Sequence, residues 1–145
     1  KQAVTAALAE TEDPRERLRA IPRAFAGAVR RRPFLPQLML REIAAGGPNL
    51  PAEAVEQIAE IMGMTRAVLS EGAATGVFRR VDPFVTHLML IGSLMFMANA
   101  LRMRQRFSGV LELPPQTMDE LDSLTDRMFD VALNGIASNE IRGGN

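Results

Sequence analysis

Apolar residues recur at three- and four-residue steps along most of the chain, which is the spacing of one face of an α-helix. Proline, glycine and capping residues divide this pattern into segments. The predicted helices cover residues 2–10, 14–32, 33–46, 51–76, 82–106 and 117–137. No alternating apolar and polar run of strand length lies beside hairpin-turn residues. The sequence therefore predicts an all-α fold, a helical bundle of about five to six helices.

Short motifs mark the ends of several of these helices. Asp13-Pro14 followed by Glu16 is a capping box, in which the aspartate and the glutamate satisfy backbone donors of the first turn. The segment from Thr117 to Glu120 has the same pattern. Gly46-Gly47-Pro48 is expected to end the third predicted helix, because glycine suits the left-handed conformation that follows a helix.

One predicted helix carries no charge over nineteen residues, from Pro83 to Leu101. That length meets the requirement of a membrane-spanning helix. The run also contains polar side chains, among them Thr86, His87 and Asn99, and the chain has no Trp or Tyr for an interfacial belt. The other helices are amphipathic and would lose their apolar partner if this one entered a bilayer. We therefore expect no membrane partner, and a membrane-associated helical protein is the weaker alternative.

A helix that is apolar all round is buried on all sides in a soluble protein. A single layer of helices would cover only one of its faces. Its helical wheel has two stripes: Phe84, Leu88, Ile91 and Met95 form one, and Val85, Met89, Gly92, Phe96 and Met103 form the other. We expect the last two helices to pair with those of a second copy as an intersubunit four-helix bundle. The predicted dimer interface comprises Met89, Phe96, Leu121, Leu124, Met128 and Val131.

The length of 145 residues corresponds to one domain, residues 1–145. The chain has no cysteine and a single histidine, so no metal site is expected. Seventeen basic and seventeen acidic residues cancel, which gives no indication of nucleic-acid binding. The charge is uneven, however: residues 1–51 carry nine cations and five anions, whereas residues 112–140 carry one cation and seven anions. We expect the last helix to be acidic on its solvent side.

Nine methionines are typical of an interior that adapts to ligands of varied shape, although methionine also fills ordinary cores. We predict a pocket between the helices at 14–32, 33–46, 51–76 and 82–106, lined by apolar side chains and few polar ones. The expected ligand-binding residues are Phe25, Leu38, Met62, Thr65, Leu69, His87, Ile91 and Met95. For Thr65 and His87, a hydrogen bond within the core is the other interpretation.

The remaining polar clusters have structural explanations. Arg30-Arg31-Arg32 and the arginines at 102, 104 and 106 lie near predicted helix C-termini, where cations favour the helix dipole. Arg41 and Glu42 are adjacent and so lie about 100° apart on a helix, and Glu42 is expected to cap or pair internally. No phosphate-binding loop, nucleophile elbow or metal motif is present. We expect neither catalysis nor a cofactor.

Three segments carry a family resemblance. They are Arg41-Glu42 within LMLREIAAGG, the run Gly76-Val77-Phe78-Arg79-Arg80-Val81-Asp82-Pro83, and Leu133-Asn134-Gly135-Ile136-Ala137. The second is the most specific, since it combines a C-cap glycine, one buried aromatic, an N-cap aspartate and a first-turn proline. From residue 10 to 139 the chain resembles the C-terminal regulatory domain of tetracycline-repressor-like (TetR/AcrR) transcription factors.

The resemblance implies a cytoplasmic, homodimeric regulator whose pocket binds a small apolar or amphipathic effector. In that family an N-terminal helix-turn-helix domain binds operator DNA. We expect this domain to be absent from the chain, with residues 1–10 ending the helix that joins the two domains. Ligand binding would then change operator affinity by favouring one arrangement of the DNA-reading heads. The alternative function is a stand-alone dimeric helical carrier of lipophilic ligands.

Overall fold

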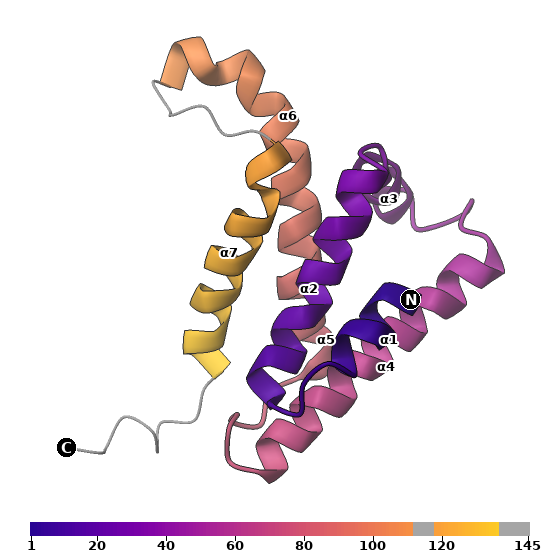
Figure 1. Cartoon of the computed structure of the whole chain (residues 1–145). Coiled ribbons are helices and arrows are strands. Elements are labelled where there is room, and N and C mark those ends of the chain that lie inside the picture. The colour runs from indigo at the N-terminus through magenta and orange to yellow at the C-terminus, as the bar shows by residue number, and fades with distance from the viewer. Residues whose placement is uncertain (112–117, 137–145) are drawn as a thin grey trace.

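A computed structural model describes residues 1–111 and 118–136 as a bundle of helices (Figure 1). A π-helical turn, η1, interrupts the longest helical stretch, and a 3-10 turn, η2, precedes the last helix. The elements are α1 (Gln2–Leu8), α2 (Pro14–Arg31), α3 (Leu35–Ala44), α4 (Ala52–Ala74), α5 (Pro83–His87), η1 (Leu88–Gly92), α6 (Ser93–Leu111), η2 (Met118–Glu120) and α7 (Leu121–Ile136). No β-strand occurs in the two described ranges, and the all-α prediction is confirmed.

The central helix of the bundle is α2. It packs against α1, α4, α6 and α7, and Figure 1 shows it running between α4 on one side and α7 on the other. Leu18, Ile21 and Val29 on its inner face are fully buried. Burying one such side chain stabilises the fold by about 1.5–3 kcal/mol. The helical spacing of these residues in the sequence therefore identifies the face on which the core is built.

The predicted helix start at Asp13 can be compared with the structure. The Asp13 carboxylate accepts a hydrogen bond from the backbone N–H of Arg15 at 3.0 Å, so the aspartate cap is confirmed. The reciprocal half of the capping box does not form, because Glu16 pairs with Arg19 at 3.4 Å while the Asp13 N–H donates to the Thr11 hydroxyl. The predicted box at Thr117 lies outside the described residues.

The uncharged helix differs from its prediction in phase and in length. It continues from α5 through the π turn η1 into α6 and ends at Leu111 rather than near residue 106, so Arg104 lies before its C-terminus. A π turn is wider than an α-helical turn, and the residues after it are rotated relative to an unbroken α-helix. The predicted stripe is therefore split: Phe84 and Leu88 are exposed, while Ile91 and Met95 are buried.

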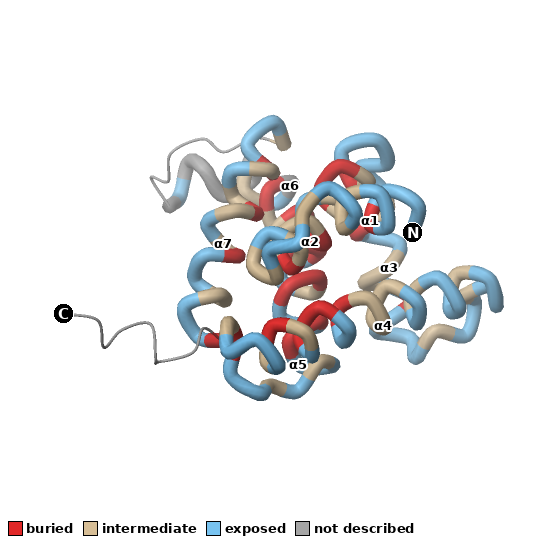
Figure 2. Tube along the Cα trace, turned by 60° about the horizontal axis from the view of Figure 1, so that its bottom comes forward, coloured by how far each residue is buried: buried red, intermediate tan, exposed pale blue. Residues whose placement is uncertain are grey.

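The length and hydropathy of the segment Pro83–Leu101 would also suit a membrane span, with a mean hydropathy of 1.7. In this structure 44% of its most apolar window is buried inside the chain. Leu90 and Leu94 are buried in the core. Figure 2 shows buried stretches in the interior of the bundle. This is the pattern of a core helix with one uncovered face.

The acidic side of α7 is partly exposed, as expected, and it also meets the arginines of α2. Asp122, Asp126 and Asp130 recur at four-residue steps and meet three arginines of α2. Arg23 binds Asp126 through two hydrogen bonds of 2.7 and 3.0 Å, Arg19 binds Asp130 at 2.8 Å, and Arg30 pairs with Asp122. The Asp126 carboxylate raises the pKa of the Arg23 guanidinium above its ordinary value. We name these three pairs the α2–α7 charge seam.

Candidate functional site

Two of the predicted ligand-binding residues bind each other. The Thr65 hydroxyl on α4 lies 2.9 Å from Nδ1 of His87 on α5, and both side chains are buried. The hydroxyl also lies 3.2 Å from the Ile61 carbonyl, to which it donates. Because the hydroxyl proton is donated to that carbonyl, the Thr65 oxygen accepts a hydrogen bond from the Nδ1–H of the neutral imidazole. Burial lowers the pKa of His87, so its imidazole is neutral at neutral pH. The hydrogen bond ties α4 to α5.

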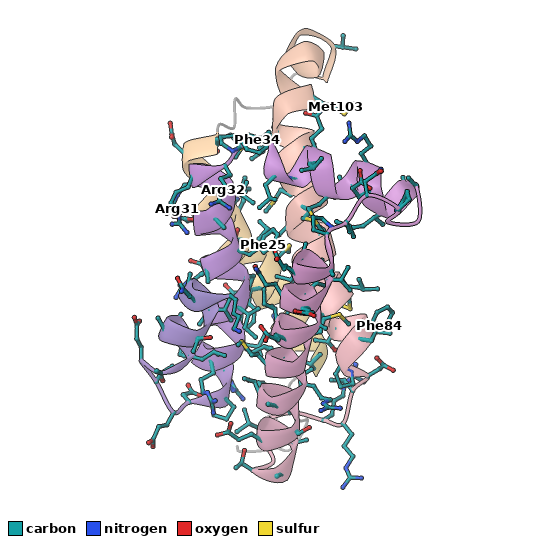
Figure 3. The ribbon with its side chains drawn as sticks, turned by 90° about the vertical axis from the view of Figure 1, so that its right-hand side faces the viewer. Phe25, Arg31, Arg32, Phe34, Phe84 and Met103 are labelled. Carbon is teal, nitrogen blue, oxygen red and sulfur yellow. The ribbon has the colours of Figure 1, made fainter. Side chains whose placement is uncertain are left out.

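Four further predicted residues meet in the interior. Leu69, Ile91 and Met95 belong to one buried apolar cluster, and Phe25 packs against it. Figure 3 shows Phe25 extending from α2 toward α4. Partly buried residues that the sequence analysis did not select complete this cluster, and they are Met39, Ile61 and Met64. These side chains pack together in the core, and Leu69 also lines a groove of about 370 Å³ between α4 and the run before α5.

Met62 and Leu38 lie away from this cluster. Met62 lines a separate groove of about 490 Å³ between α4 and α5, together with Arg66 and Phe84. Leu38 lies on α3 with an exposed side chain. The structure therefore does not bring the eight predicted residues into one cavity.

A cavity of about 860 Å³ opens between α1, the end of α2, the start of α3 and the N-terminal half of α4. We name it the α2–α4 groove. Its walls are formed by Lys1, Gln2, Ala3, Ala28, Arg31, Arg32, Leu35, Glu53, Glu56, Gln57 and Glu60. None of the eight predicted residues is among them. The predicted pocket was apolar, whereas this groove is strongly charged.

The groove stays open because α4 is built in two halves. The buried residues of α4 are Thr65, Val68, Leu69 and Gly72, all in its C-terminal half. Figure 2 shows the other half extending outward with exposed and half-buried residues. An ion pair of 2.8 Å between the Lys1 ammonium and Glu60 connects α1 to this outer half. The sequence did contain an indication of the groove, since Glu53, Glu56, Gln57 and Glu60 share one helical face.

The groove is also bounded by α3, which packs against α6. The loop after α3 is held by Glu42, whose buried carboxylate accepts the backbone N–H of Asn49 at 3.2 Å and its side-chain amide. The prediction that Glu42 pairs internally is confirmed. The Arg41 guanidinium also lies 3.6 Å from the Glu42 carboxylate, although the two residues are about 100° apart on the helix.

The predicted dimer residues fall into three groups. Met89, Phe96 and Val131 are exposed, by 48%, 70% and 76%, while Leu124 and Met128 are half-buried. Leu121 is fully buried in a cluster with Ala26, Val29 and Leu94 of its own chain, so its side chain has no surface to offer a partner. A groove of about 480 Å³ separates α5 and the start of α6 from α7, with Met89, Met128 and Val131 among its lining residues.

The run Gly76–Pro83 folds as its sequence predicts. Gly76 has φ +74°, Phe78 is 2% exposed, and the Asp82 carboxylate accepts the Val85 N–H at 2.9 Å. The Arg79 N–H also donates to the Ile136 carbonyl at 3.0 Å, so the run joins α4 and α5 to the end of α7. In the described part of the chain, no group of three His, Asp or Glu side chains could hold a metal ion.

Comparison with known proteins gives one family. A family model described as tetracyclin repressor-like, C-terminal domain, matches residues 11–99. The match includes α2 to α5, η1 and the run Gly76–Pro83, and it ends within α6. No curated protein and no solved structure matches the chain.

Proposed function

Because this chain belongs to the tetracyclin repressor-like C-terminal domain family, we propose that it is the small-molecule-sensing and dimerisation domain of a transcriptional regulator. Ligand binding in this domain alters the operator affinity of an N-terminal DNA-binding domain. The effector is a small molecule held between the helices of each subunit. The proposal needs two surfaces, one for a second copy of the chain and one for the ligand.

The observation that carries the proposal is the uncovered apolar face on α5, α6 and α7. Phe96 and Val131 on this face are among the most exposed large apolar side chains of the described residues. An apolar area of this kind costs free energy in water, and covering it favours association. A two-fold axis through this face would place two helices from each subunit in a four-helix bundle.

The second surface is the α2–α4 groove. Its volume of about 860 Å³ lies within the range of small-molecule sites, which is roughly 300–1,000 Å³. It touches α1, whose Val4 is buried in the core and whose Lys1 binds Glu60. A ligand that binds one position of α1 more tightly than another would shift the population between them.

Light scattering tests the dimer directly. We expect about twice the chain mass of 15.9 kDa at micromolar concentration. Phe96→Asp places a carboxylate near its symmetry mate, and burying such charges costs several kcal/mol per ion, so this variant is expected to be a monomer. Ile43→Asp is the matched control, because Ile43 is also exposed, by 55%, but lies on α3. A monomeric wild-type chain would contradict the proposal.

A further inference from the structure

We propose that the α2–α4 groove binds a zwitterionic small molecule, with the anionic group of the ligand at Arg31 and Arg32 and its cationic group at Glu53 and Glu56. This inference rests on the proposed sensing function and names its ligand class. It is carried by the opposite charges that the end of α2 and the first half of α4 bring to the lining of one groove.

The cationic wall is the end of α2. Arg31 occupies the last turn of α2 and Arg32 is its C-cap residue, and Figure 3 shows both at this end of the helix. Their neighbour Arg30 pairs with Asp122 in the charge seam, whereas neither Arg31 nor Arg32 forms an ion pair with a described residue. Guanidinium groups bind carboxylate and phosphate groups through paired hydrogen bonds. These two side chains are therefore available for an anionic group.

The anionic wall is the first half of α4. Glu53 and Glu56 lie three residues apart and share a face with Glu60. Glu60 is held by Lys1, whereas Glu53 and Glu56 have no cationic partner among the described residues. Like charges at this spacing repel each other, and a bound cation would relieve that repulsion.

The two walls together select the class of ligand. A simple anion would face the carboxylates of α4, and a simple cation would face the arginines of α2. Exposed ion pairs are individually weak, so useful affinity requires contacts with both walls at once. Ala3, Ala28 and Leu35 contribute small apolar surfaces to the same groove. A zwitterion with a short apolar tail satisfies all three parts of the lining.

Three probes of similar tail length test this class by calorimetry with the full chain. Octanoylcarnitine carries a quaternary ammonium and a carboxylate, octanoate only the anion, and octyltrimethylammonium only the cation. We expect octanoylcarnitine to bind at least about tenfold more tightly than the other two at low salt, since each loses one wall. Equal affinities would overturn the ligand class.

Two double variants should change which of the three probes binds most tightly. Arg31→Gln with Arg32→Gln removes the cationic wall and should leave octyltrimethylammonium the best ligand. Glu53→Gln with Glu56→Gln removes the anionic wall and should leave octanoate the best ligand. Arg79→Gln with Arg80→Gln is the control, because these adjacent arginines are exposed outside the groove and should not change the preference for octanoylcarnitine.

The outcomes separate this inference from the function on which it rests. If octanoate or octyltrimethylammonium binds most tightly to the wild-type chain, and the groove variants weaken it, the zwitterion class is wrong and a sensing groove stands. If none of the three probes binds at millimolar concentration, the inference fails. The proposed dimerisation is then still tested independently, by the mass that light scattering gives. An unchanged preference in both groove variants would place the site elsewhere and overturn the proposal.

Discussion

Gly72 on α4 shows how closely one residue can be fixed by its neighbour. An added Cβ would lie 2.1 Å from Cδ2 of the buried Phe78 ring, so the ring would have to move. We expect Gly72→Ala to destabilise the fold by about 1–3 kcal/mol, the usual cost of overpacking a core. Urea unfolding measures this change.

Gly63 provides the matched control in the same helix. An added Cβ there meets nothing within 4 Å, so Gly63→Ala should raise the free energy of unfolding by about 0.5–1 kcal/mol through helix propensity alone. If both variants were equally stable, the close packing of Phe78 on Gly72 would be disproved.

His87 predicts a specific dependence of stability on pH. Its pKa is lowered in the folded chain by burial, below the ordinary value of 6.5. As the pH falls, His87 is therefore protonated in the unfolded chain before it is protonated in the folded chain. The free energy of unfolding should consequently fall as the pH drops below about 6.5. Above that pH the contribution is fully present. Since the chain has no other histidine, His87→Gln should flatten the profile between pH 7 and about 5.5. Equal profiles would contradict a buried neutral imidazole.

At this scale the sequence predicted some roles and left others open. Gly76, Phe78, Asp82 and Glu42 have local roles, set by turns and caps within a few residues, and their roles follow from spacing. The Thr65–His87 hydrogen bond joins residues on two helices, 22 positions apart. Sequence reasoning left these two residues open between a ligand site and a satisfied core pair, because the choice depends on how α4 and α5 pack.

At the scale of elements, the α2–α7 charge seam can be tested by a double-mutant cycle. Arg23→Gln and Asp126→Asn each remove one partner of the bidentate pair. Both side chains are partly exposed, so we expect a coupling energy of about 0.2–1 kcal/mol that decreases with added salt. Unfolding of the two single variants and the double variant gives the value.

A second cycle serves as the control for the seam. Arg66 on α4 is exposed and lines the groove between α4 and α5, so Arg66→Gln should show no coupling to Asp126→Asn. A coupling of the same size in both cycles would mean that net charge, and not the contact between α2 and α7, determines the effect.

The positions of the helices along the chain were largely predictable, whereas the way in which the helices pack against one another was not. Helix starts at Pro14, Ala52 and Pro83 follow from local capping and proline chemistry. The π turn at Leu88–Gly92 has no such local cause in the sequence, and it rotates one half of the apolar helix relative to the other. The pairing of the acidic face of α7 with the arginines of α2 was not predicted, because a helix wheel does not say which charged helix lies opposite.

At the scale of the whole molecule, the open groove and the apolar face are both regions that the core leaves uncovered. Sequence reasoning expected a second apolar face on the uncharged helix, and Met89 and Phe96 on it are exposed, while the partner that would cover them stays a prediction. It placed the ligand site in the interior, where Phe25, Leu69, Ile91 and Met95 pack together, and that site stays a prediction. An opening between helices depends on how they splay, and only the arrangement of α1 to α4 determines that.

The last prediction separates the two roles of α7, which packs on its own chain and is expected to meet a partner. Leu121 is fully buried, so Leu121→Ala should lower the free energy of unfolding by about 2–5 kcal/mol through the lost contacts and the cavity. Val131 is 76% exposed, so Val131→Asp should leave the core packed and shift the sedimentation coefficient to that of a monomer. Dimer stability depends on concentration, and both variants are therefore compared with the wild-type chain at equal concentrations. If Val131→Asp remains dimeric while Leu121→Ala dissociates at temperatures where it stays folded, the partner packs on a different face and the four-helix bundle is wrong.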